Sequence, residues 1–180
     1  MHAASSIILH GIGALTCFGL ALVVLYQNPY RRCHVAFSAL ASVLGLWSIG
    51  VILITRSTRV EDAIFWIRMT FVVVAWLPVC FHYFVGVFPR TKYEGPRWFL
   101  YTLLVAPVVL IPLAFSPWYI LSVEIPPDGP PITVYGPVFL LYGAVIIATM
   151  LWSFPMLFSK RRLVSGLERR QVEHVILGIS

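Results

Sequence analysis

Charged residues are scarce in this sequence, and their scarcity excludes a water-soluble domain. Of the 180 residues, 11% are charged and 59% are hydrophobic, whereas a soluble domain carries about 25% charged residues. A single core of this size cannot bury so many apolar side chains, and the mean hydropathy of +0.88 agrees with that judgement. The composition therefore predicts an integral membrane protein whose main partner is the lipid bilayer.

Cysteines and familiar catalytic motifs are also scarce. The three cysteines, Cys17, Cys33 and Cys80, lie in or beside apolar runs and show no C-x-x-C spacing. We expect them to pack as small hydrophobic residues, because this count and spacing indicate neither a disulfide framework nor a zinc site. The sequence also has no nucleophile-elbow motif, no glycine-rich phosphate loop and no H-E-x-x-H motif. It therefore predicts no catalytic residues, no metal site and no cofactor.

Long apolar runs are what the sequence does contain. A spanning helix needs about 20 mostly apolar residues, and five segments meet this requirement: residues 5–26, 33–55, 63–88, 98–115 and 137–158. A sixth apolar segment begins at residue 172 and the sequence ends within it, so we expect a domain truncated from a longer chain. The prediction is an all-α polytopic membrane helix bundle, with five complete transmembrane helices plus the start of a sixth.

The basic residues lie between the apolar runs and indicate orientation. The net charge of +6 and the pI near 9.6 would suggest a nucleic-acid partner in a soluble chain, but here we expect none. Loops carrying Arg31 and Arg32, Arg90 to Arg97, and Lys160 to Arg170 all fall on one side of the membrane. The positive-inside rule places that side in the cytoplasm and the N-terminus outside.

The loop between the fourth and fifth segments is long and rich in proline and glycine. It lies on the outer side and cannot form a continuous helix. We expect Trp118 to Leu121 to form a short element at the membrane interface, and residues 123–134 to form a small hairpin turning at Asp128 and Gly129. The alternative is a plain connector without regular structure.

The third segment carries an arginine and a proline in an otherwise apolar run. Arg68 lies roughly 8 Å below the outer end of the predicted helix. Its side chain either snorkels to the headgroups or faces the bundle, where it would pair with Glu61 or Glu124 or bind an anionic ligand. Pro78 predicts a kink, because proline removes one backbone hydrogen bond from a helix.

Three parts of the sequence resemble a known family of membrane domains. The stretch NPYRRCHVAFSALASVLGLWSIG, the W-x-R of Trp66 and Arg68 followed by Pro78 and FH at Phe81, and the stretch ERRQVEHVILG carry the resemblance. Together they resemble the seven-helix membrane region at the N-terminus of bacterial sensor histidine kinases, which is also found on some diguanylate cyclases. The resemblance covers nearly the whole chain, although no kinase segment is present.

The resemblance implies a sensing role. It implies a single input domain over residues 1–180, in the bacterial inner membrane, that passes an extracellular or intramembrane signal to a cytoplasmic kinase working as a homodimer. Residues expected to line a pocket for a small amphipathic or anionic ligand are Trp47, Trp66, Arg68, Trp118, Tyr119 and Glu124. Two other functions stay open from the residues alone: a small membrane transporter subunit and a lipid-modifying membrane enzyme.

Overall fold

Six helices and one β-hairpin make up the part of the chain that the structure describes. The computed structural model describes residues 2–89, 97–126 and 129–163, and also residues 166, 170 and 173. The elements in chain order are α1 (His2–Gln27), α2 (Arg32–Thr55), α3 (Val60–Val74), α4 (Leu77–Val87), α5 (Arg97–Ala114), β1 (Ile120–Glu124), β2 (Ile132–Tyr135) and α6 (Pro137–Leu163). The sixth predicted segment, from residue 172 onward, lies outside the described residues apart from Glu173.

Five spans in this part of the chain are long and apolar enough to cross a membrane. They are residues 4–27, 32–55, 60–87, 97–114 and 137–160. Each coincides with one of the five apolar runs, so the prediction of a polytopic helix bundle is confirmed. The structure extends the last of these helices to Leu163, five residues beyond the predicted end at Phe158.

The third span is two helices rather than one. Helix α3 ends at Val74, α4 begins at Leu77, and the two residues between them form a turn. Pro78 lies in the first turn of α4, where a missing N–H group costs no helical hydrogen bond within α4. The carbonyl of Val74 loses the donor that a continuous helix would supply at position 78. The span is therefore interrupted close to its middle.

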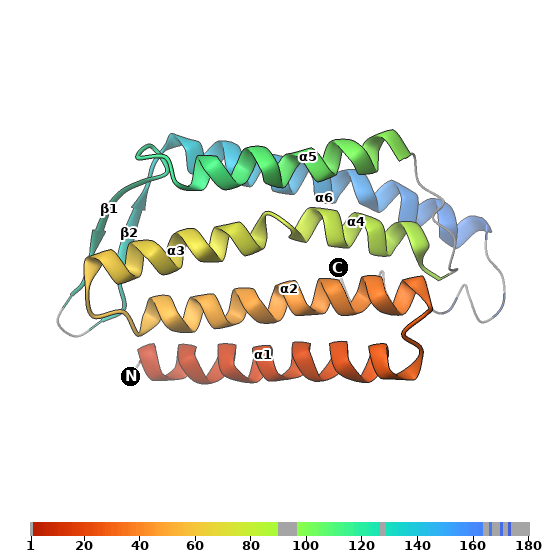
Figure 1. Ribbon diagram of the computed structural model, residues 1–180, viewed down its shortest axis with the longest axis horizontal. Coiled ribbons are helices and arrows are strands. Elements are labelled where there is room, and N and C mark those ends of the chain that lie inside the picture. The colour runs from red at the N-terminus through yellow and green to blue at the C-terminus, as the bar shows by residue number, and fades with distance from the viewer. Residues whose placement is uncertain are drawn as a thin grey trace.

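The broken span is the central element of the bundle. Figure 1 shows α3 and α4 running between α2 on one side and the α5–α6 pair on the other, with α1 at the edge beyond α2. Small residues allow the close approach of α2: Gly50 meets Thr70 of α3, and a Cβ at Gly50 would overlap the Thr70 Oγ1 atom. Helix α1 is joined to α2 by the Ser38 hydroxyl, which donates to the Ala21 carbonyl at 2.8 Å. Such small-residue contacts are the usual means of helix association in a bilayer.

The loop between α5 and α6 folds as the predicted hairpin. We name this end of the bundle the outer end, and the opposite end the inner end, after the orientation that the charge pattern predicts. Strands β1 and β2 pair antiparallel, with Val123 opposite Thr133 and Glu124 opposite Ile132. The hairpin prediction is confirmed, although Asp128, at the predicted turn, lies outside the described residues. The separate element predicted for Trp118 to Leu121 is wrong in part, because Ile120 and Leu121 belong to β1. At the base of the hairpin a Cβ at Gly136 would overlap the Trp118 carbonyl, so only glycine fits there without a shift.

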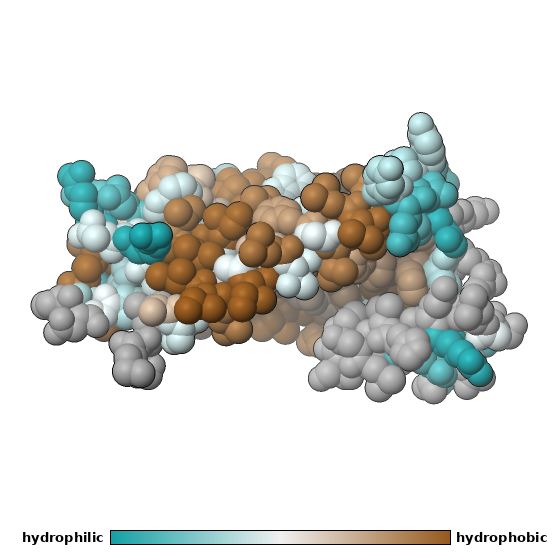
Figure 2. Space-filling view, turned by 90° about the horizontal axis from the view of Figure 1, so that it is seen from below, coloured by the Kyte–Doolittle hydropathy of each residue, from teal (hydrophilic) through white to brown (hydrophobic). Residues whose placement is uncertain are grey.

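Charged and apolar residues are distributed as a membrane requires. Viewed from the α1 side, Figure 2 shows a broad hydrophobic band across the middle of the molecule and hydrophilic residues towards both ends. Helix α1 contributes exposed Ile8, Leu9, Ile12 and Leu15 to this surface. Arg31, Arg32 and Arg97 are exposed at one end, whereas Arg59, Glu61 and Asp62 are exposed at the other. The exposed apolar side chains are suited to lipid rather than to water.

Candidate functional site

Helix α6 contacts both halves of the broken span through polar side chains. At the outer half, the Tyr142 hydroxyl donates a hydrogen bond to the carbonyl of Phe71. That carbonyl also accepts the N–H of Ala75 at 2.9 Å, which is the hydrogen bond that closes the last turn of α3. Tyr142 is 1% exposed, so this contact is shielded from competing groups. Tyr142 therefore fixes the end of α3 that precedes the break.

The inner half of the span is held by a histidine–serine pair. His82 on α4 and Ser153 on α6 form a hydrogen bond between Nδ1 and Oγ at 3.0 Å, and both side chains are buried. The ring of Phe99 on α5 lies edge-on to the imidazole, with centroids 4.7 Å apart. The Ser153 hydroxyl also donates to the Thr149 carbonyl within its own helix at 3.1 Å. His82 thus joins α4 to α6 in the interior of the bundle.

Lys160 closes the inner end of the same interface. Its Nζ donates to the carbonyls of Val85 at 2.8 Å, Gly86 at 2.7 Å and Phe88 at 2.7 Å. The last carbonyls of a helix lack intrahelical donors and carry partial negative charge, so a cation placed there is stabilising. With the side chain only 3% exposed, the amino group uses the α4 terminus in place of water. Lys160 is a buried cap on α4, supplied by α6.

An aromatic cluster fills the outer end of the bundle. We use this name for Phe71, Tyr119, Tyr135, Phe139 and Tyr142. Phe71 lies at its centre, with ring centroids 5.0 Å from Tyr119, 6.1 Å from Tyr135, 5.8 Å from Phe139 and 5.4 Å from Tyr142, all in edge-on geometry. Edge-on aromatic pairs add about 0.5–1.5 kcal/mol each beyond area burial. The cluster anchors the hairpin and the start of α6 to α3.

Tyr119 brings an unpaired hydroxyl into this cluster. Its side chain is fully buried, and its hydroxyl has no hydrogen-bond partner among the described residues. Burial, followed by the nearby Tyr142 and Tyr135, raises the pKa of Tyr119 well above its usual range. The hydroxyl therefore keeps its proton at physiological pH and presents an unused donor.

Arg68 brings a second unused donor, one turn before Phe71. Its Nε is buried and has no hydrogen-bond partner in the part of the chain that the structure describes. The guanidinium carbon lies 5.8 Å from the centroid of the Phe115 ring, just after α5, which is within the range of a cation–π interaction. Glu61, one of the partners considered above, instead pairs with Arg59 at 3.8 Å on the exposed surface. The side chain thus points towards α5.

The other predicted pocket residues do not gather around Arg68. Trp47 on α2 lies beside the break between α3 and α4, where it lines a cavity with Val74 and Leu77. Trp66 is half-buried and stacks edge-on against Phe65 at 5.0 Å. Trp118 is 65% exposed and Glu124 is exposed on β1. The structure therefore places Trp47 beside the break. Of the other five residues, Arg68 and Tyr119 have a buried polar atom without a partner among the described residues.

Sequence reasoning missed the inward-facing residues of α6. It treated Lys160 as one of several basic residues in a loop and gave no role to Tyr142 or Ser153. The signal was present as spacing, because positions 142, 149, 153 and 160 recur at about three and a half residues per turn along one face of an apolar helix. A polar stripe of this kind in a spanning helix indicates a buried interface.

Comparison with known proteins identifies the family. A family model for the N-terminal seven-transmembrane region of histidine kinase matches residues 9–180. The chain belongs to this family. No curated protein and no solved structure matches the chain. The match confirms the resemblance seen in the second, third and sixth apolar segments, and it makes this a multi-pass membrane domain of the histidine kinase type.

Proposed function

We propose that this chain is the input domain of a two-component sensor histidine kinase in the bacterial inner membrane. A signal on the outer side or within the bilayer would alter the bundle, and the following helices would pass the change to a cytoplasmic kinase working as a homodimer. The observation that carries the proposal is the match of the histidine kinase membrane region over residues 9–180. A membrane region joined to the N-terminal side of a kinase is in a position to control it.

The arrangement of α6 supports such a role. A sensor needs two arrangements of its bundle that a signal favours unequally. The third span is already divided into two helices, and α6 holds the outer half through Tyr142 and the inner half through Ser153 and Lys160. Because α6 is the last spanning helix among the described residues, movement of α3 or α4 is transmitted towards the C-terminal side of the domain.

Arg68 and Tyr119 supply the proposed recognition of a signal. Both present buried donors without partners among the described residues, and a buried donor left unpaired costs about 1–3 kcal/mol. A ligand with an acceptor group, such as a carboxylate, would remove this cost. We therefore assign an anionic or amphipathic ligand to the outer end of the bundle, with Arg68 as its charged partner and Trp66, Trp118 and Glu124 at the surrounding surface.

Autophosphorylation of the full-length protein tests the kinase assignment. Membranes containing the full-length chain are incubated with ATP, and the phosphorylated product is tested for stability in acid and in base. We expect an acid-labile and base-stable phosphoryl group, which is the behaviour of phosphohistidine. Formation of cyclic diguanylate from GTP instead would preserve the sensor role and replace the kinase with a cyclase. A full-length chain with neither activity would contradict the proposal.

A further inference from the structure

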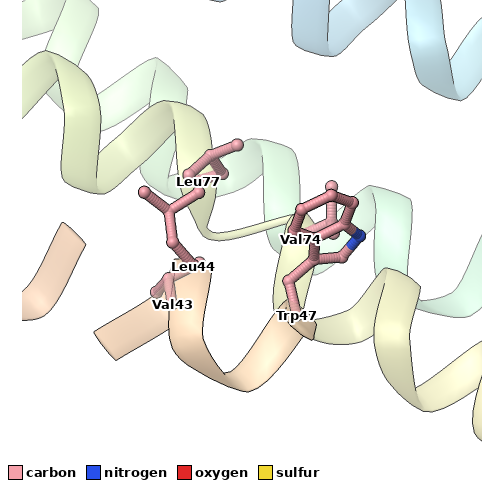
Figure 3. Close-up of a pocket in the computed structure, with 5 residues that line it drawn as sticks. All are labelled: Val43, Leu44, Trp47, Val74 and Leu77. Atoms are coloured by element: carbon pink, nitrogen blue, oxygen red, sulfur yellow. The ribbon is translucent and has the colours of Figure 1, made fainter. Parts of the chain in front are cut away.

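An apolar cavity lies beside the break in the third span. Its volume is about 240 Å³, and it is lined by Val43, Leu44 and Trp47 of α2, with Val74 and Leu77 on either side of the break. Figure 3 shows these five side chains gathered next to the non-helical link between α3 and α4. Four of the five are aliphatic and the fifth is an indole, so the cavity suits a hydrocarbon group rather than a polar one.

The depth of the cavity limits what can reach it. Leu44 lies about 18 Å along α2 from Arg32, and Val74 lies about 21 Å along α3 from Val60. Both positions are near the middle of their spans, and the hydrocarbon core of a bilayer is about 30 Å thick. The cavity is therefore close to the bilayer midplane, where the ends of lipid acyl chains are the surrounding solvent.

The cavity is open enough and large enough for such a chain end. Trp47, on its wall, is 40% exposed, so the cavity is not sealed from the surface. An apolar cavity of about 150 Å³ takes a benzene molecule, which gives this one room for roughly eight to ten carbon atoms. We propose that the methyl end of one acyl chain of a bilayer phospholipid occupies this cavity between α2 and the α3–α4 break.

Occupancy bears directly on the angle between α3 and α4. Val74 is the last residue of α3 and Leu77 is the first of α4, so an acyl chain touching both acts on the two halves at their junction. Lys160 and Ser153 hold α4 from the other side of the span. When an acyl chain end enters or leaves the cavity, α4 shifts against these contacts. The domain thereby senses the state of the bilayer interior. This regulation rests on the proposed sensor function, whereas occupancy of the cavity does not.

Quenching of Trp47 fluorescence measures occupancy without any kinase readout. In the full-length protein the other five tryptophans of this domain (Trp66, Trp76, Trp98, Trp118 and Trp152), and any tryptophans beyond residue 180, are replaced by phenylalanine. The protein is placed in vesicles of phosphatidylcholine brominated near the methyl end of the chain or near the headgroup. We expect strong quenching by the chain-end bromine and weak quenching by the headgroup-side bromine. The reverse order would overturn the proposal.

A cavity-filling variant separates an inserted chain from ordinary lipid contact. Val74→Phe fills the cavity, whereas Leu46→Phe adds the same ring at a residue of α2 that is 46% exposed. We expect Val74→Phe to lower chain-end quenching by roughly half and Leu46→Phe to leave it unchanged, because only the former displaces an occupant. Equal quenching in both variants would overturn the proposal. If Val74→Phe misfolds, the enlarging variant Leu77→Ala serves instead, with increased quenching expected and no increase contradicting the proposal.

Kinase activity then tests the regulatory part separately. Autophosphorylation of the full-length protein is compared in vesicles of short-chain and long-chain phosphatidylcholine. We expect the wild-type rate to depend on chain length and the rate of Val74→Phe not to depend on it. A wild-type autophosphorylation rate that does not depend on chain length, together with the expected quenching of Trp47, would contradict regulation by the acyl chain. It would leave occupancy of the cavity supported.

Discussion

Tyr119 and Tyr142 form a natural comparison at the scale of single residues. Both are buried in the aromatic cluster, but the Tyr142 hydroxyl donates to the Phe71 carbonyl, and the Tyr119 hydroxyl has no partner among the described residues. The two side chains therefore have the same size and surroundings and differ in hydrogen bonding. Their phenylalanine variants separate the value of the ring from the value of the hydroxyl.

We predict that only one of the two variants lowers the stability of the domain. Tyr142→Phe loses a hydrogen bond and should lower the free energy of unfolding by about 0.5–1.5 kcal/mol. Tyr119→Phe removes an unpaired buried donor and should leave that free energy unchanged or raise it by up to about 1–3 kcal/mol. Thermal unfolding in detergent micelles without added ligand measures both. A loss of stability in Tyr119→Phe as large as in Tyr142→Phe would mean that its hydroxyl has a partner.

Lys160 matters at the scale of the helix elements, because it joins α6 to the end of α4. We predict that Lys160→Met lowers the free energy of unfolding by about 1.5–3 kcal/mol, the range for hydrogen bonds to a charged group. Methionine keeps much of the apolar length of lysine and supplies no donor for the carbonyls of Val85, Gly86 and Phe88.

Arg162→Met is the matched control for this prediction. Arg162 is exposed near the same end of α6, and its loss should change the free energy of unfolding by less than about 0.5 kcal/mol. Both variants are followed by denaturant unfolding in the same micelles. Equal effects of the two substitutions would show that the cap on α4 contributes nothing beyond a surface charge.

The elements also show which parts of the fold the sequence predicts. The spans follow from composition, because the thickness of a bilayer fixes the length of an apolar run, and the hairpin follows from the prolines and glycines that prevent a helix. Pro78 indicated a kink, and the structure has two helices there. Lys160 looked no different from Arg161 and Arg162 in a count of charges. Only the pairing of α6 with α4 distinguishes it.

The candidate site was less predictable than the spans, because it depends on which helix faces meet. Trp47 and Arg68 both belong to the outer half of apolar segments, and sequence reasoning placed them in one pocket. Gly50 brings α2 against Thr70, so Trp47 and Val74 lie on that face of the third span. Arg68 points to Phe115 on another face. The rotation of one helix against its neighbour is set by contacts between distant residues, which local patterns do not specify.

At the scale of the whole molecule, the charge distribution predicts the orientation in the membrane. The end with Arg31, Arg32 and Arg97 should be cytoplasmic, and the end with Glu61 and the hairpin should be outside. Single cysteines are introduced as Glu124→Cys and Arg162→Cys after replacing the three native cysteines. In intact cells we expect an impermeant thiol reagent to label position 124 and not position 162. Labelling at position 162 alone would reverse the orientation.

The central claim is that this domain controls a kinase through the interior of its bundle, and Arg68→Lys in the full-length protein tests it most directly. Lysine keeps the charge and snorkels as well as arginine, but it cannot make a planar bidentate contact with an anionic group. Arg59→Lys makes the same change at an exposed position.

The measurement is the autophosphorylation rate in proteoliposomes at equal protein levels, with proper insertion verified. The account predicts a change of roughly fivefold or more for Arg68→Lys, the lower end of typical coupling between sites, and no change for Arg59→Lys. Unchanged autophosphorylation in both variants, and in Arg68→Gln as well, would contradict it.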